Sequence, residues 1–336
     1  MSLPESQLER LETTVPTDVA DPEAVLGQSP TQLAVGRFRR DKLSMISLIV
    51  VVGYTFCALL APLLVKLGVL EPTKGHQDLL DPTLGSVPKG SFGGASWAHP
   101  LGVVPGSGWD VLSRLWYGIT FSLTIALAAS LVAIVLGTIL GIISGFSGGI
   151  VDSVVGRLVD LTLSFPQTLM LLALSATGVA IAAKYLPGST SDPLPNAFYE
   201  VLVLGLFGWP AITRLIRGQV LSIREREFID AARLLGASRR RLYFKEILPN
   251  LWAPVLVSFT LTMPAYISAE AALSYLNVGI KPPTPTLGNV LVDSINYSSS
   301  DFMFFFFPAL LIAIIVVSFN LLGDGLRDAL DPKADR

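Results

Sequence analysis

The sequence predicts an all-α membrane protein with six transmembrane helices. Hydrophobic residues make up 51% of the 336-residue chain and charged residues only 15%, and the mean hydropathy is +0.60. This is too little charge to cover a water-facing surface, which excludes an ordinary soluble enzyme. The net charge of −2 provides no basic face for nucleic acid. One cysteine, Cys57, and two histidines predict neither a disulfide nor a metal centre.

Six stretches are apolar and long enough to cross a bilayer, whose core of about 30 Å requires about 20 helical residues. They cover 44–65, 121–146, 160–183, 198–216, 251–276 and 302–322. Pro210 interrupts the fourth stretch, and Pro254, Pro264 and Glu270 interrupt the fifth. Both are retained as helices, because neighbouring helices can satisfy the backbone groups that a proline leaves free.

The remaining segments complete the expected organisation. Residues 1–36, rich in acid, Pro and Thr, are expected to form a disordered cytoplasmic tail, and the late start of the first apolar run argues against a signal peptide. The segments that follow are a cytoplasmic arm and first helix (37–66), an extracytoplasmic segment (67–118), a transmembrane core (119–326) and a cytoplasmic C-terminal tail (327–336).

Lys and Arg set the expected orientation. A group at positions 37, 39, 40 and 42 lies directly before the first span, and a larger group lies between the fourth and fifth spans, at positions 224, 226, 233, 239–241 and 245. Cytoplasmic flanks carry the excess of positive charge in membrane proteins. Both termini are therefore expected in the cytoplasm. Within the third span, Asp160 is expected to pair with Arg157, one helical turn earlier.

The segment 224–249 predicts a hairpin of two short helices. Phe228, Ala231, Ala232 and Leu235 recur at helical spacing, and Gly236 then provides a helix stop. Ser238 is expected to cap a second short helix that ends at Pro249. The small side chains around the turn allow another protein to approach closely.

Arg239, Arg240 and Arg241 crowd the start of that second helix, where the helix dipole disfavours cations. Anionic lipid or an acidic partner surface would compensate for this, although the positive-inside signal alone is an alternative explanation. A helix-turn-helix that reads DNA is excluded, because a hairpin held between two spans cannot lie in a major groove.

The sequence of this hairpin resembles a motif of a known protein family. The run from Asp230 to Gly236 with Ile247-Leu248-Pro249 resembles the E-A-A…G…L-P loop of ABC importer permeases, with Asp230 in place of the usual Glu. Further matches lie at His99–Gly102, Phe165-Pro166, Pro282–Pro285 and Asn320–Asp328. Together they resemble the C-type subunit of the dipeptide/oligopeptide/nickel permease family, over nearly everything after residue 37.

The resemblance implies a type I ABC importer permease fold in the bacterial inner membrane, with no catalytic or metal site in this chain. It implies a homologous second permease, two cytoplasmic ATP-binding subunits that hold ATP and Mg²⁺, and an extracytoplasmic substrate-binding protein that lands on 67–118 and 277–301. The residues expected to dock an ATPase subunit are Asp230, Ala231, Ala232, Gly236, Ala237 and Arg239. The implied substrates are di- or oligopeptides, with nickel, haem or another peptide-like compound as alternatives.

Glu270 is the candidate pore or gate residue, because a carboxylate within a span is expensive and faces a cavity or partner by default. A structural hydrogen bond to a nearby Ser or Thr is the alternative. A proton-coupled secondary transporter using Glu270 or Asp160 is a rival class, but no internal inverted repeat supports it. The sequence lacks G-x-x-x-x-G-K-[ST], so no ATPase site is expected, and it supplies no polar constellation for a membrane enzyme.

Overall fold

The computed structural model describes residues 30–330, and they are mostly helical. A two-stranded antiparallel ribbon, in which Leu80 pairs with Pro88, is the exception to the all-α prediction. The elements are α3 Pro30–Arg40, α4 Lys42–Lys66, η1 Gln77–Leu79, β1 Leu80–Asp81, η2 Pro82–Leu84, β2 Val87–Pro88, α5 Val111–Ser147, α6 Gly149–Ser164, α7 Gln167–Tyr185, α8 Pro193–Ile223, α9 Glu227–Leu234, α10 Arg239–Arg241, η3 Leu242–Ile247, η4 Leu248–Leu251, α11 Trp252–Tyr275, α12 Leu287–Ile295 and α13 Phe302–Leu330.

Six helices in the described part of the chain are long and apolar enough to cross a membrane, as the sequence predicts. Several extend beyond the predicted spans because local capping signals lie outside the apolar runs. The Asp110 carboxylate accepts a hydrogen bond from the Ser113 N–H at 2.7 Å and starts α5 ten residues before the apolar run expected from 121. At the other end of that helix, Gly148 (φ +63°) terminates it.

The predicted third span is divided. Phe165 is extended (ψ 132°) and Pro166 follows, so α6 ends at Ser164 and α7 begins at Gln167. The residue before a proline is driven out of the helical region, which accounts for the break. The apolar run from 160 therefore crosses a helix boundary, and α7 alone is the membrane-spanning part.

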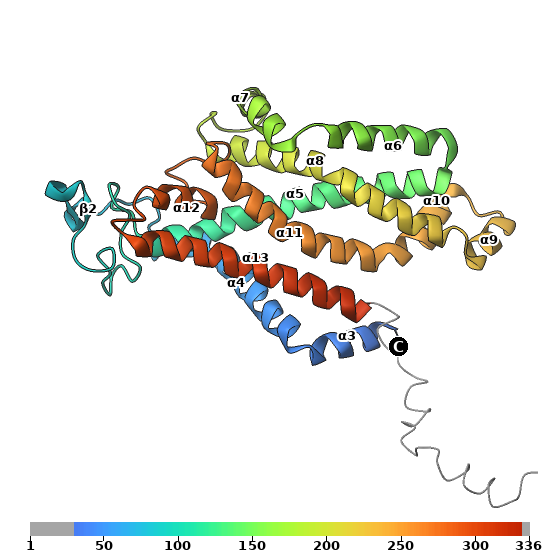
Figure 1. Ribbon diagram of the computed structural model, residues 1–336, viewed down its shortest axis with the longest axis horizontal. Coiled ribbons are helices and arrows are strands. Elements are labelled where there is room, and N and C mark those ends of the chain that lie inside the picture. The colour runs from blue at the N-terminus through green and yellow to red at the C-terminus, as the bar shows by residue number, and fades with distance from the viewer. Residues whose placement is uncertain (1–29, 331–336) are drawn as a thin grey trace, which may run out of the picture.

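The long helices run side by side, with α3 and α4 along one side and α6 and α7 along the other (Figure 1). Helix α5 lies in the middle and packs against α8, α11 and α4. The β ribbon and α12 lie at one end, and α9 and α10 lie at the opposite end, toward which α13 also runs (Figure 1). Residues 30–36 of the expected N-terminal tail belong to α3, and 327–330 of the expected C-terminal tail belong to α13. The rest of the two expected tails, 1–29 and 331–336, lies outside the described residues.

Close packing of α5 on α8 depends on glycines one helical turn apart. A Cβ at Gly137, Gly141 or Gly145 would stand 2.5, 2.7 or 2.9 Å from the Cβ atoms of Ile212, Ile216 and Val220 respectively. Small residues at this spacing let two membrane helices approach closely. The glycines thus hold α5 and α8 together along the half of the molecule that leads to α9.

Candidate functional site

The hairpin predicted at 224–249 is present, and its first helix is α9. Ile229 is fully buried and fixes one face of α9, while Leu234 and Leu235 are 89% and 85% exposed. Of the predicted docking residues, Asp230, Ala231, Gly236 and Arg239 are exposed, and Ala232 and Ala237 are half-buried. The hairpin therefore presents small side chains and apolar side chains on its outer surface.

Gly236 ends α9 in the left-handed conformation (φ +79°). The Gly236 N–H donates to the Arg233 carbonyl at 2.9 Å, and the Ala237 N–H donates to the Ala232 carbonyl at 3.0 Å. This pair of bonds is the Schellman arrangement, which satisfies the last carbonyls of a helix and favours glycine. The sequence prediction of a stop at Gly236 is confirmed.

The second half of the hairpin differs from the prediction. The Ser238 hydroxyl accepts from the Arg241 N–H at 3.4 Å and starts α10, as expected. The chain then passes through the π-helical turn η3 and the 3₁₀ turn η4 directly into α11, so no separate helix ends at Pro249. A proline is tolerated in the first turn of a helix, where its missing N–H has no partner to lose.

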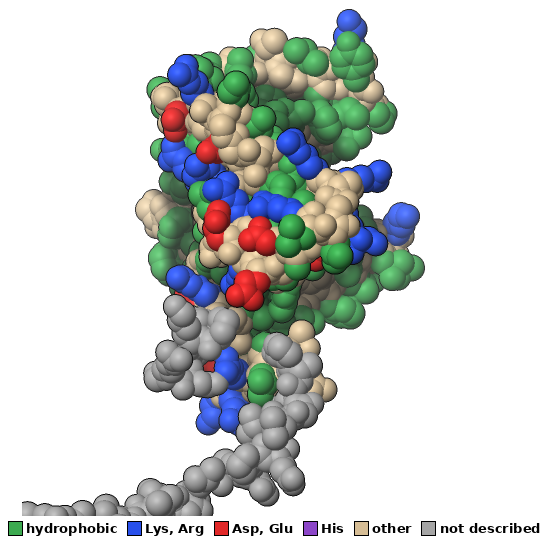
Figure 2. Space-filling model, turned by 90° about the vertical axis from the view of Figure 1, so that its right-hand side faces the viewer, with side chains coloured by type: hydrophobic (Ala, Val, Ile, Leu, Met, Phe, Trp, Pro, Cys, Tyr) green, Lys and Arg blue, Asp and Glu red, His purple; other side chains and the backbone are tan. Residues whose placement is uncertain are grey.

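Charged side chains gather on the end of the molecule that carries α9 and α10, with Lys and Arg outnumbering Asp and Glu there (Figure 2). Asp230 is paired within the chain, because Arg233 Nη1 lies 3.1 Å from its carboxylate. Asp160 pairs with Arg214 of α8 at 2.5 Å, and the predicted pairing with Arg157 is wrong. The spacing of three residues allowed that local pair, but α8 lies alongside α6 and supplies a closer partner.

The hairpin is held firmly to the ends of three long helices. Ile229 of α9, Ile247 of η3 and Leu251 of η4 share a buried cluster with Ile216 and Val220 of α8. In addition, the Arg224 guanidinium donates to the Gly145 carbonyl at 3.0 Å, and the hydroxyls of Ser147 and Tyr243 lie 3.1 Å apart. Packed interiors transmit displacement, so movement of the hairpin would be passed to α5, α8 and α11.

Glu270 is enclosed, with 1% of its surface exposed. Its carboxylate accepts hydrogen bonds from the hydroxyls of Thr286 (2.6 Å), Ser122 (2.9 Å) and Ser274 (3.2 Å). These donors come from α5, α11 and the start of α12, where Thr286 also forms a capping box with Asn289. This geometry agrees with the alternative prediction, a structural hydrogen bond to a nearby Ser or Thr. Glu270 of α11 connects its own helix to α5 and to the start of α12.

Glu200 of α8 was not singled out from the sequence. It is fully buried, and neither of its carboxylate oxygens has a hydrogen-bond partner within residues 30–330. An acidic residue inside the fourth apolar run is the signal that could have drawn attention to it.

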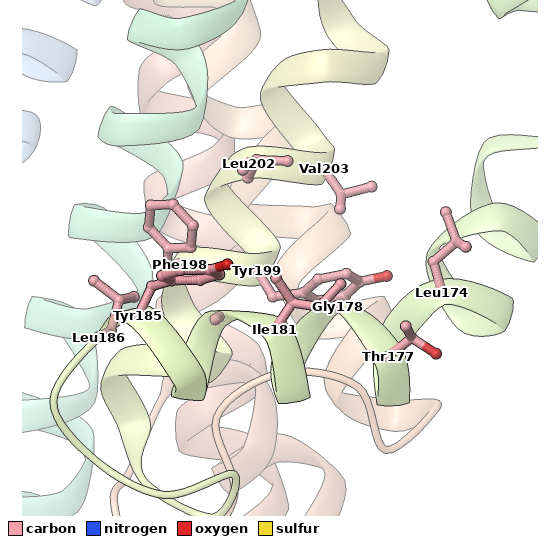
Figure 3. A pocket seen from close by; sticks show the side chains of 11 residues that line it. Leu174, Thr177, Gly178, Ile181, Tyr185, Leu186, Phe198, Tyr199, Leu202 and Val203 are labelled. Atoms are coloured by element: carbon pink, nitrogen blue, oxygen red, sulfur yellow. The ribbon is translucent and has the colours of Figure 1, made fainter.

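Two cavities flank α7. The first, of about 470 Å³, lies between α7 and α8 and is lined almost entirely by apolar groups, including Leu174, Ile181 and Phe198 (Figure 3). The second, of about 320 Å³, is more polar and is lined by Ser175, Asn196 and residues of the 277–281 loop. A polar ligand fits the second cavity better than the first.

The 67–118 segment packs on the same end as α12 (Figure 1). Arg114 is fully buried, donates to the carbonyls of Pro72 and Pro283 at 3.2 and 3.0 Å, and stacks on the Trp109 ring at 4.1 Å. His99 Nδ1 lies 2.9 Å from the Asp110 carboxylate. Within residues 30–330, no cluster of three or more His, Cys, Asp or Glu side chains is placed to hold a metal ion.

Two family models match the chain: the binding-protein-dependent transport system inner membrane component over residues 137–336, and the N-terminal TM domain of oligopeptide transport permease C over residues 29–82. The dipeptide transport system permease of Escherichia coli K12 is 39% identical over 92% of this chain and 95% of its own. The oligopeptide transport system permease of Bacillus subtilis is 34% identical over 89% and 88%.

The fold is also that of a solved structure. The MetNI methionine ABC transporter in an inward-facing conformation has a chain that superposes with a TM-score of 0.51 at 19% identity, covering 66% of this chain and 97% of that one. At this identity the likeness concerns the fold alone. The family models and the relatives that share a third or more of its residues show that the chain belongs to the binding-protein-dependent transport system inner membrane component family, as a multi-pass permease subunit of an ABC transporter in the bacterial inner membrane.

Proposed function

We propose that this chain forms half of the translocation pathway of an ABC importer for di- or oligopeptides. Its relatives in Escherichia coli, Bacillus subtilis and Alkalihalophilus pseudofirmus carry dipeptide or oligopeptide transport in their names, at 32–39% identity over about nine-tenths of the chain. The proposed partners are a homologous second permease, two ATP-binding subunits that hold ATP and Mg²⁺, and an extracytoplasmic substrate-binding protein. The permease itself is proposed to have no ATPase site.

The single observation that carries the coupling role is the 224–249 hairpin. It offers the small residues Ala231, Ala232 and Gly236 beside the exposed Leu234 and Leu235, and its other face is buried against the ends of α5, α8 and α11. A partner protein that binds this surface and then moves would displace α5, α8 and α11 together. We infer that Glu270, by contrast, fixes α12 to α5 and α11 and does not act as the gate.

Substitution of an exposed small residue tests the docking role. Ala231→Trp adds a bulky side chain to a solvent-facing position, so the chain should insert and fold normally but fail to co-purify with its ATP-binding subunits. Ala231 is a cleaner probe than Gly236, whose positive φ penalises any larger residue. Asp328→Trp, at an exposed position of α13, is the control. Normal ATPase co-purification of Ala231→Trp would overturn the docking assignment.

Transport is tested with the complete complex in proteoliposomes. Uptake of labelled dialanine that requires ATP and the binding protein is expected. Uptake of Ni²⁺ or haem in its place, or dialanine uptake that follows a proton gradient without ATP, would overturn the peptide-importer proposal.

A further inference from the structure

Two carboxylates lie in the interior of the membrane-spanning helices, and they differ in one respect. Glu270 is compensated by three hydroxyl donors. Glu200 is as deeply buried but receives no hydrogen bond at either oxygen from the described residues. Buried polar groups are nearly always paired, and an ionised carboxylate left unpaired in an apolar interior is strongly disfavoured. Both oxygens of Glu200 are therefore available to a hydrogen-bond donor from outside the described chain.

The surroundings of Glu200 point to the polar cavity. Glu200 lies one helical turn after Asn196, which lines that cavity, so both side chains are on the same face of α8. Gly279, which also lines the cavity, lies directly against Glu200: a Cβ on Gly279 would be 2.0 Å from Glu200 Oε1. Gly279 thus contacts both the carboxylate and the cavity of about 320 Å³.

The group best suited to bind the Glu200 carboxylate is a cation that can donate hydrogen bonds. No Lys, Arg or His of the described chain lies within ion-pair distance of it. A metal ion is a poor match, because residues 30–330 hold no cluster of three or more ligand side chains. An ammonium group carries one positive charge and three donors.

We propose that Glu200 accepts the charged amino terminus of a transported peptide when the peptide occupies the cavity between α7, the start of α8 and the 277–281 loop. The inference rests on the proposed peptide transport and adds the group that recognises the substrate. Asn196 and Asn277 supply neutral polar lining for the peptide backbone. Movement of the 277–281 loop away from α8 would expose the Glu200 carboxylate to the cavity. Gly279 has no side chain that would block this opening.

Lys281 is the rival partner within the chain. It lines the same cavity, and its flexible side chain could neutralise Glu200 if the loop rearranged. The two partners predict different behaviour for Lys281→Met. If Lys281 and Glu200 form a pair, Glu200→Gln should cause no further loss of uptake in a Lys281→Met background. If a peptide ammonium is the partner, Glu200→Gln should lower uptake by about the same factor in that background as in the wild type.

The first test measures dialanine uptake by the full complex in proteoliposomes, with the wild-type binding protein at saturation. Glu200→Gln keeps the size of the side chain and removes its charge, so uptake should fall about tenfold or more, while assembly and melting temperature should match the wild type. Glu200→Gln should lower uptake by about the same factor when it is added to Lys281→Met. Wild-type uptake by Glu200→Gln, or no further loss when Glu200→Gln is added to Lys281→Met, would overturn the inference.

The second test reads the charge of the cavity itself. Ser175 lines the cavity, and Cys57 is the single native cysteine, so Ser175→Cys in a Cys57→Ser background places one thiol there. The probes are a cationic aminoethyl thiosulfonate and its uncharged methyl analogue, applied during ATP-driven turnover. The ratio of their reaction rates should be about fivefold or more higher with Glu200 than with Glu200→Gln. Equal ratios would contradict a role in attracting ammonium groups.

The two proposals fail in different ways. If the wild-type complex takes up no dialanine, peptide transport itself is wrong. If the wild type transports dialanine and Glu200→Gln does so equally well, only the role of Glu200 is wrong.

Discussion

Glu270 shows how a single acidic residue can determine the connection between helices. Its carboxylate accepts hydrogen bonds from Ser122 on α5 and from Thr286 at the start of α12. The Ser122 hydroxyl accepts in turn from the Leu287 N–H at 3.0 Å. The network is fully enclosed, so each member depends on the others for satisfaction.

Glu270→Gln should destabilise the protein without removing a transport site. The amide replaces one acceptor oxygen with a donor and leaves at least one hydroxyl without its bond, which costs about 1–3 kcal/mol. A lower melting temperature of the purified complex is the expected readout. Ser274→Ala, which removes only the longest of the three bonds, should have a smaller effect, and an unchanged melting temperature for Glu270→Gln would contradict the structural role.

Asp152 of α6 contributes to the stability of the folded protein in a way that depends on pH. The hydrogen bond from the Arg217 guanidinium is the main cause that lowers the pKa of Asp152 to about 2, and the Ser144 hydroxyl adds to it. Because the pKa is lower in the folded than in the unfolded protein, the stabilisation is complete above about pH 4 and is lost as the pH falls toward about 2.

Asp152→Asn should therefore lower the melting temperature near neutral pH and have progressively less effect in acid. The measurement is the difference in melting temperature between wild type and variant from about pH 6 down to about pH 3. Asp328→Asn, at an exposed position of α13, is the control. A wild-type advantage that grows in acid would contradict the ion pair with Arg217.

At the scale of elements, the contact of α5 with α8 is the connection between the hairpin and the membrane core. Gly141 faces Ile216 so closely that no side chain fits between the helices. Gly141→Leu should force them apart and destabilise the protein by about 1–3 kcal/mol. Thermal denaturation in detergent micelles measures this.

Gly218, which lies on α8, is the matched control for the Gly141→Leu substitution on α5. No atom lies within 4 Å of where its Cβ would be, so Gly218→Leu should leave the melting temperature unchanged or slightly raise it, as expected when a helical glycine is replaced. Equal destabilisation by both substitutions would show that close packing of α5 on α8 is not the cause.

At the scale of the whole molecule, the hairpin and the beginning of α3 and end of α13 lie toward one end, and the β ribbon lies at the other (Figure 1). We expect the hairpin end in the cytoplasm, because it carries the denser group of Lys and Arg. Single cysteines in a Cys57→Ser background test this at Leu235 and Trp97, which are 85% and 103% exposed.

A membrane-impermeant maleimide should label Trp97→Cys in spheroplasts and Leu235→Cys only in inverted vesicles. Labelling of both from one side, or the reverse pattern, would contradict the proposed orientation. The reverse pattern would also place the hairpin away from any cytoplasmic ATP-binding subunit.

The sequence by itself determined the features that depend on short stretches of chain. Apolar length predicts each membrane helix, and Gly236 and Ser238 predict the turn of the hairpin because helix ends have local signals. The break at Phe165-Pro166 is equally local, although the apolar run across it concealed the boundary.

Only the tertiary structure decided which charges meet. Asp160 pairs with Arg214 and not with its neighbour in sequence, and Glu270 is satisfied by residues up to 148 positions away. Glu200, also an acidic residue within an apolar run, has no hydrogen-bond partner among the described residues. Helix length and termini follow from nearby residues, but the environment of a side chain depends on which distant helices pack around it.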